Sequence, residues 1–402
     1  MKTMKKKKKK TTAFGCIATL AMTLGGCGGE GLTGPTGPTD PCEGQEPGTA
    51  CTWLGTKGNT GFNGDGNPRY DTQVNQVQDL LFLPDGTAWF TDFNNFLVRK
   101  VLPDGTVESV VGWTDPVFPG DGPQSGLPPD GAPGDEWQLN HPTNLLLAED
   151  GSVVLVAWHN HKLLTIDPDT GWVKVVCGKG AGFAGDGGPA SGALFKQPND
   201  ATFDDDGNLY IADQQNFRIR RIDTQDQIDT IAGVGTQGDS GDGGPALDAE
   251  FSWAAGSNPN PSGGILHHDG KLYIADTEAH RVRVLDLDTM IVDALAGTGE
   301  KGFAGDGGPA IDALLSGPRD LEIGPDGELY VADTDNGAVR AINLDDGTIR
   351  TAVGTGELGL DDEEQLSATE THLRRPFGIA FDPDGNLYVM DSLNERIVKV
   401  AR

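Results

Sequence analysis

The feature that most constrains this fold is a segment that occurs six times along the chain. One copy reads GNLYIADQQNFRIRRID over residues 207–223, and a degenerate copy begins at Gly151. The remaining copies begin at Gly86, Gly270, Gly327 and Gly385. Successive copies lie 56 to 65 residues apart. A repeat with a regular period outweighs any domain count estimated from the length of 402 residues.

Each copy predicts four short β-strands. In the third copy, residues 200–203, 209–212, 218–222 and 228–232 are rich in apolar and β-branched residues and are bounded by Gly, Asp and Asn. The first two segments flank an Asp-Gly sequence, which predicts a hairpin turn because Gly adopts positive φ and Asp caps its own backbone. Calcium loops are the alternative, but these turns lack the twelve-residue spacing and final Glu of an EF-hand.

Four antiparallel strands repeated around an axis predict an all-β, six-bladed β-propeller with four-stranded blades. The sixth copy ends at residues 398–402, within its third strand. The missing fourth strand has a counterpart near the N-terminus, because CTWLG at residues 51–55 matches the closing strand of the other copies. We therefore expect this N-terminal strand to complete the last blade and close the ring without an open edge.

Several motifs together resemble bacterial NHL-repeat proteins over residues 51–402. They are L-x-x-P, then GNLYIAD, N-x-R-I-R-x-I, and a closing AGxG with GDGGPA. The resemblance implies a six-bladed propeller. It leaves the function open, because this family includes adhesive ectodomains, RNA-binding regulators, sensor domains, an amidating lyase and a streptogramin lyase.

The N-terminus predicts export. Residues 1–26 carry seven lysines, no acidic residue, and an apolar run too short to span a membrane comfortably, as in a secretory signal peptide. Leu24-Gly25-Gly26-Cys27 resembles the lipobox of bacterial lipoproteins, which implies a lipid on Cys27 and, with Gly28 next, the outer membrane. The alternative is an ordinary signal peptide with an incidental cysteine. Residues 27–50, rich in Gly, Pro and Thr, predict a flexible tether.

Removing residues 1–26 leaves 23 Lys and Arg against 60 Asp and Glu, a net charge of −37. This charge and the predicted export argue against nucleic acid as a partner. Cys42 and Cys51 are expected to form a disulfide in an exported protein. Cys177 replaces a small apolar residue of the other copies and is expected to be a buried, inert thiol.

The propeller topology places every repeated polar motif on one face. The aspartate that ends each LYIAD segment is expected to be structural, for example by pairing Asp213 with Arg218. The aspartates of the GDG loops are interpreted as turn formers between blades, since Gly flanks them on both sides. These loops include Asp65, Asp121, Asp186, Asp242 and Asp306.

A candidate site lies two residues after the proline of L-x-x-P, where the family generally has Gly. Four copies place an oxygen-bearing side chain there, at Asp79, Asn144, Asp200 and Asp320. Gly263 and Gly378 occupy the position in copies four and six. Oxygen ligands converging on an axis suit a hard cation such as calcium or magnesium, or a hydroxyl-rich or cationic ligand. The alternative is that these side chains cap separate turns.

An enzymatic site has less support. The amidating lyase places zinc-binding histidines directly after the prolines, whereas this sequence has Thr143, Asn199, Ser262, Arg319 and Phe377 there. We therefore expect a monomeric, lipid-anchored and non-catalytic binding or scaffolding module for a protein or polysaccharide ligand. A lyase or lactonase-like enzyme with a metal at the channel mouth is the alternative. A deep axial pocket with converging ionisable groups would favour the enzyme, and a broad face with variable loops the binding module.

Overall fold

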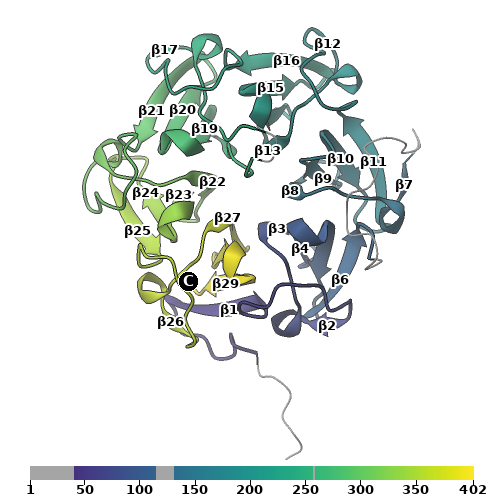
Figure 1. The fold of residues 1–402 in the computed structure, drawn as a ribbon, viewed down its shortest axis with the longest axis vertical. Coiled ribbons are helices and arrows are strands. Elements are labelled where there is room, and N and C mark those ends of the chain that lie inside the picture. Colours follow the sequence, from purple (N-terminus) through teal and green to yellow (C-terminus); the bar gives the residue numbers. More distant parts are fainter. Residues whose placement is uncertain (1–39, 115–130, 257–258) are drawn as a thin grey trace, which may run out of the picture. The chain divides into compact units, whose positions relative to one another are not determined.

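The computed structural model describes residues 40–402 apart from 115–130 and 257–258. Six antiparallel sheets surround a central axis as the blades of a propeller (Figure 1). The all-β, six-bladed prediction is confirmed. Among the described residues, the only helices are three-residue 3-10 turns, and none is long and apolar enough to cross a membrane.

Each blade has four main strands, counted outward from the axis. The innermost strands are β3 (Val77–Phe82), β8 (Pro142–Leu147), β13 (Pro198–Phe203), β18 (Ile265–His268), β22 (Pro318–Ile323) and β27 (Pro376–Phe381). The second strands are β4 (Ala88–Asp92), β9 (Val153–Ala157), β14 (Leu209–Asp213), β19 (Lys271–Asp276), β23 (Leu329–Asp333) and β28 (Leu387–Asp391). The third strands are β5 (Leu97–Val101), β10 (Lys162–Ile166), β15 (Arg218–Ile222), β20 (Arg281–Asp286), β24 (Ala338–Ile342) and β29 (Arg396–Val400). The fourth strands are β6 (Thr106–Val111), β11 (Trp172–Cys177), β16 (Gln227–Ala232), β21 (Ile291–Ala296), β25 (Ile349–Val353) and β1 (Thr49–Gly55).

Five of the six sheets have a fifth strand, where four were predicted. Four of these two-residue strands end in proline, and each of the five pairs with the outer strand of its blade. They are β2 (Asn67–Pro68), β7 (Ala132–Pro133), β12 (Gly188–Pro189), β17 (Gly244–Pro245) and β26 (Leu366–Ser367). The fifth blade has instead an isolated bridge between Pro309 and Thr348. Two residues are too few for the apolar periodicity that predicts a strand, which is why the sequence pattern missed them.

The 3-10 turns occupy two recurrent positions. One set follows the short outer strands or their equivalents: η1 (Arg69–Asp71), η3 (Gly134–Glu136), η4 (Ala190–Gly192), η6 (Ala246–Asp248), η8 (Ala310–Asp312) and η10 (Ala368–Glu370). The other set follows the second strand of a blade: η2 (Phe93–Asn95), η5 (Gln214–Asn216), η7 (Thr277–Ala279), η9 (Thr334–Asn336) and η11 (Ser392–Asn394).

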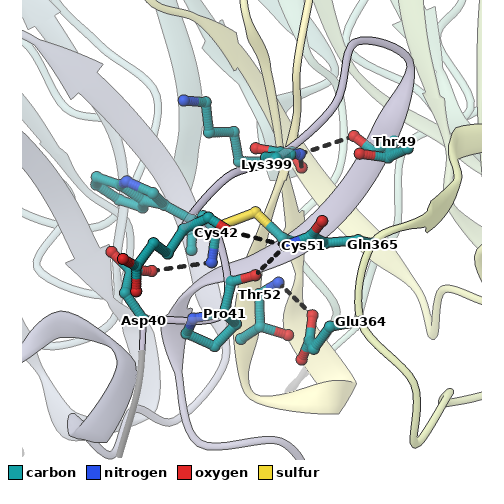
Figure 2. The surroundings of a disulfide bond; sticks show 12 residues. Asp40, Pro41, Cys42, Thr49, Cys51, Thr52, Glu364, Gln365 and Lys399 are labelled. Carbon is teal, nitrogen blue, oxygen red and sulfur yellow. Dashed lines mark hydrogen bonds between the residues drawn. A yellow bond between two sulfur atoms is a disulfide. The ribbon is translucent and has the colours of Figure 1, made fainter.

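The N-terminal strand closes the ring as predicted. Strand β1 pairs antiparallel with β29, from Ala50 opposite Val400 to Gly55 opposite Arg396. The Cys42–Cys51 disulfide joins this strand to the segment before it, and Figure 2 shows the backbone N–H of Thr52 donating to Glu364 at 2.7 Å. The strand begins two residues before the predicted boundary at residue 51. The predicted signal peptide, Cys27 and the tether up to residue 39 lie outside the described residues.

The hydrophobic core consists of six clusters, one at each interface between neighbouring blades. The cluster between the last and first blades contains Trp53, Phe90 and Tyr388, so the closing interface is packed like the others. Cys177 is a free, buried thiol in the cluster between the second and third blades. Burial raises its pKa to about 12, which keeps the thiol protonated and unreactive.

A buried arginine on the third strand links the LYIAD and GDG motifs of a blade. Arg220 lies 3.4 Å from Asp213 and also pairs with Asp186 of the GDG loop. The predicted partner of Asp213 was therefore wrong, because Arg218 turns outward and donates to the carbonyl oxygen of Val234. Equivalent double pairs hold Arg99, Arg283 and Arg340. The GDG aspartates are thus partners of buried charges as well as turn residues, although Asp121 lies outside the described part of the chain.

Candidate functional site at the mouth of the axial channel

The innermost strands carry the predicted site residues to the axis. Asp79, Asn144, Asp200 and Asp320 all line a recess at one end of the channel and a cavity of about 320 Å³ behind it. Apart from these four residues, the recess is lined by residues just N-terminal to the ring position in each blade, and the cavity by residues just C-terminal to it. The four side chains therefore form a ring between the recess and the cavity, and the structure brings the whole predicted set together.

Each aspartate of this axial ring cross-links two blades. Asp200 Oδ1 accepts the backbone N–H of Ala201 in its own blade at 2.8 Å, and Oδ2 accepts that of Ile265 in the next blade at 2.7 Å. The other two repeat this arrangement: Asp79 with Leu80 and Leu145, and Asp320 with Leu321 and Ile379. The aspartates thus join blades one to two, three to four and five to six.

Glycine at the intervening positions allows a close approach between blades. A Cβ on Gly378 would lie 2.1 Å from the carbonyl oxygen of Gln78, and one on Gly264 would lie 1.9 Å from that of Arg319. Gly264 is the structural equivalent of Asp200. Its carbonyl oxygen accepts the backbone N–H of Ala275 in the LYIAD segment, and Asp200 is paired with the corresponding Ala212. The sequence pattern had placed Gly263 at this position. A one-residue offset in the loop before β18 caused this error.

The ring concentrates carboxyl groups of which Asp79 and Asp200 are buried and Asp320 is partly buried. Burial raises the pKa of Asp79 to about 6 and that of Asp200 to about 8, and the charge of Asp79 adds to the shift of Asp200. Burial and repulsion by Asp200 and Asp79 raise the pKa of Asp320 well above its usual range. Glu322, which the sequence analysis missed, lines the cavity, and burial raises its pKa to about 8. Its position two residues after Asp320 puts it on the same face of β22, and this spacing was the available signal.

The predicted cation site is untested and stays a prediction. In the part of the chain that the structure describes, no group of three or more His, Cys, Asp or Glu is arranged to hold a metal ion. Both oxygens of each ring aspartate accept a backbone N–H, so a cation would have to use their remaining lone pairs. Asn144 Oδ1 is buried and has no hydrogen-bond partner among the described residues.

The recess in front of the ring has a volume of about 30 Å³. Besides the ring, it is lined by Gln78, Thr143, Asn199, Pro261, Arg319 and Phe377. Pro261 comes from the long loop between β17 and β18, which the side chain of Gln214 holds through the carbonyl oxygens of Ala254 and Asn260. The recess therefore combines residues from the scaffold strands with one from an inserted loop.

Arg319 is the cation of this recess, and the sequence analysis assigned it no role beyond its position after a proline. The residue is buried, with an exposed fraction of 6%, and its guanidinium carbon lies 4.5 Å from the ring centroid of Phe377. Its Nε and Nη1 atoms have no hydrogen-bond partner among the described residues, and the same holds for Nε2 of Gln78. Burial, with a smaller effect of Arg375, lowers the pKa of Arg319 to about 9, so it stays charged at neutral pH.

Three histidines lie close together in the second blade. His159 and His161 lie in the turn after β9, and Nδ1 of His159 is 2.9 Å from Nδ1 of His141. His161 accepts the backbone N–H of Gln197 through Nδ1. Burial first, and repulsion by His159 second, lower the pKa values of His141 and His161 to about 3 and 4, so both are neutral at physiological pH. The hydrogen bond between Gln197 and His161 connects the third blade to the second, whereas the contact between His141 and His159 lies within the second blade.

Fold and site together define a six-bladed propeller with a polar axial mouth. No family model matches the sequence. The chain is 28% identical over 306 residues to SUPPRESSOR OF QUENCHING 1, a chloroplast protein of Arabidopsis thaliana, and 29% identical over 218 residues to NHL repeat-containing protein 2 of Bos taurus. These alignments cover 73% and 47% of this chain but only 27% and 29% of the two relatives. The chain thus has distant homologues that contain NHL repeats.

Solved structures share the fold at low identity. An auxiliary nutrient binding protein of Bacteroides ovatus superposes with a TM-score of 0.61 and 16% identity, over 88% of this chain and 76% of that one. A second such protein, from Bacteroides thetaiotaomicron, gives a TM-score of 0.60 and 17% identity over 87% and 75%. At this identity the likeness establishes the fold.

Proposed function

We propose that this protein is an envelope-anchored propeller that acts as a non-catalytic binding or scaffolding module for a protein or carbohydrate ligand, which it contacts at the axial mouth. One observation carries the proposal. Buried polar groups at the mouth, on Gln78, Asn144 and Arg319, have unused hydrogen-bonding capacity and line a recess. Buried polar groups are normally paired, so an unpaired set at a surface recess favours a ligand that pairs with them.

The wider arrangement supports this function. The ring aspartates are engaged in joining blades, which gives the mouth a rigid base, and rigid scaffolds with inserted loops commonly carry recognition sites. Nutrient-binding proteins have the same fold, so the fold is compatible with ligand binding. The signal peptide at residues 1–26, lipidation at Cys27 and the tether would anchor a monomeric propeller to the outer membrane, in the periplasm or at the surface.

An enzyme remains the second candidate, on a specific observation. Asp200 and Glu322 line the inner cavity with pKa values raised by burial to about 8, a range suited to general acid or base catalysis. A lyase or lactonase-like activity would use these carboxyl groups. The binding role is favoured because both oxygens of Asp200 already accept backbone N–H groups.

The test is a binding screen with a blocked mouth. The soluble propeller, residues 40–402, is screened against immobilised polysaccharides and extracted envelope proteins, in the wild type and in two variants. Asn199→Trp fills the recess, and Asp205→Trp places the same side chain on the exposed turn at the opposite end of β13. We expect a ligand that Asn199→Trp loses and Asp205→Trp retains. Ligands that both variants bind equally well would contradict a site at the mouth.

A further inference from the structure

Arg319 differs from four other buried arginines of the propeller. Arg99, Arg220, Arg283 and Arg340 are each fully buried and each paired with two aspartates. Arg319 makes no hydrogen bond or ion pair with any residue that the structure describes. Its neighbour Arg375 approaches the same Phe377 ring but is paired with Asp335 at 3.0 Å. Among the residues that the structure describes, Arg319 is therefore a buried cation at the mouth that has no direct ion pair.

An unpaired buried charge is costly to keep. The desolvation free energy of a buried guanidinium is offset only when anions or hydrogen-bond acceptors replace the lost water. Stacking on Phe377 offsets a small part of it. Asp335 and Glu278 favour the charged form of Arg319 only at longer range, without direct contact. The unpaired Arg319 therefore lowers the stability of the fold. This is expected where a ligand in the recess supplies the missing partner.

The recess selects a small acceptor group. Arg319 offers Nε–H and Nη1–H as unused donors, and Gln78 offers its side-chain N–H, so the unused side-chain donors can serve an anion. These two residues lie on either side of Phe377 and Gly378, since Gln78 contacts Gly378 and Arg319 stacks on Phe377. A volume of about 30 Å³ accommodates about two water-sized groups. The two oxygens of a carboxylate match this size, and a carboxylate oxygen accepts a strong, charge-assisted hydrogen bond from a guanidinium N–H.

The acidic ring behind the recess does not prevent this binding. Burial and mutual repulsion raise the pKa values of Asp200 and Asp320, so both are largely protonated and uncharged near pH 7. Asp79, whose pKa is about 6, supplies one negative charge at that pH. One adjacent negative charge disfavours a dianion, such as the doubly charged form of phosphate, more strongly than a monoanion.

We infer that the recess binds the carboxylate group of a monoanionic small molecule or end group, held by the guanidinium of Arg319 and the side-chain amide of Gln78. This inference rests on the proposed function and adds the chemistry of the ligand. A sugar acid and the C-terminus of a peptide both carry such a group, and the experiment separates these two sources.

Isothermal titration calorimetry of the soluble propeller at pH 7 tests the inference. The titrants are acetate, glucuronate as a sugar acid, N-acetylglycine as a peptide C-terminus, and phosphate. Four proteins are compared: wild type, Arg319→Gln, Arg319→Lys, and Arg375→Gln as the matched control that removes the neighbouring, already paired charge. We expect saturable binding of at least one carboxylate by the wild type, at least tenfold weaker binding by Arg319→Gln, an intermediate loss in Arg319→Lys, and unchanged affinity in Arg375→Gln.

Each other outcome overturns the inference. Equal affinity in wild type and Arg319→Gln places the anion elsewhere, and an equal loss in Arg375→Gln reduces the effect to general electrostatics. Binding of phosphate in preference to every carboxylate, or no binding of any carboxylate, also rejects it. In all these cases the proposed function is retained if the screen yields a ligand whose binding Asn199→Trp abolishes. The proposed function is rejected, independently of the carboxylate inference, if the screen yields no such ligand.

Discussion

Replacing Asp200 with asparagine should reverse the order of stability of variant and wild type between pH 5 and pH 8. Burial raises the pKa of Asp200 to about 8, whereas the unfolded chain has the ordinary value of 3.8. Between these values the folded state holds a proton that the unfolded state has lost, so stability falls as the pH rises. The contribution of this group is fully present below about pH 4 and is lost as the pH approaches 8.

The magnitude follows from this difference of one proton. Each pH unit within the interval changes the free energy of unfolding by about 1.4 kcal/mol, so the wild type loses about 2.7 kcal/mol between pH 5 and pH 7 through Asp200. Asparagine does not titrate and escapes this loss. It has one acceptor oxygen instead of two, so either Ala201 or Ile265 loses a partner for its backbone N–H, which costs about 1–3 kcal/mol at every pH.

Thermal unfolding followed by circular dichroism at pH 5, 6, 7 and 8 measures the effect. The variant should melt below the wild type at pH 5 and at or above it at pH 8. The difference between the two melting temperatures should change by about 3–4 °C from pH 5 to pH 7, given the unfolding entropy expected for a domain of this size. Asp205→Asn, in an exposed turn, should follow the wild type throughout. Melting curves of Asp200→Asn that stay parallel to the wild type would refute an uncharged, buried Asp200.

Three further predictions address the axial ring, the anchor and the closure. If a hard cation binds the ring, calcium at a hundredfold excess over its dissociation constant should stabilise the wild type by about 2.7 kcal/mol, and Asp200→Ala should lose this gain; an unchanged melting temperature would remove the cation site. Cys27→Ser should abolish lipidation and membrane retention, and mass spectrometry showing an unmodified N-terminus elsewhere would contradict the lipobox. Deleting residues 51–60 should lower the melting temperature far more than deleting residues 28–40, because it removes most of β1 from the edge of β29; similar melting of both truncations would contradict closure by β1.

The sequence predicted the ring, its closure and the axial residues because these depend on periodicity. Equivalent positions in a repeated strand must approach one axis, so Asp79, Asn144, Asp200 and Asp320 could be grouped without knowing any distance. The role of each residue, in cation binding or in joining blades, could not be predicted in this way. Whether Asp200 binds a cation or joins blades depends on the backbone N–H of Ile265, which lies 65 residues away in the sequence.

Departures from the repeat were harder to foresee. Arg319 looks like one more variable residue after a proline, and only packing shows that it is buried without a partner. The pairing of Asp213 with Arg220 instead of Arg218 depends on which side chain turns toward the GDG loop. The offset at Gly264 arises from an inserted loop, and insertions of this kind cannot be aligned from one sequence.

Hydrogen–deuterium exchange with a ligand from the binding screen tests the central claim most directly, because it reports where on the ring the ligand binds. We predict slower exchange in the segments at the mouth, including residues 74–80, 140–145, 196–201 and 316–321, upon addition of ligand. The hairpin turns at the opposite end of the innermost strands should exchange at the same rate with and without ligand. Protection of those turns, or of the outer strands of the blades, with unchanged exchange at the mouth would contradict a binding site on the axis.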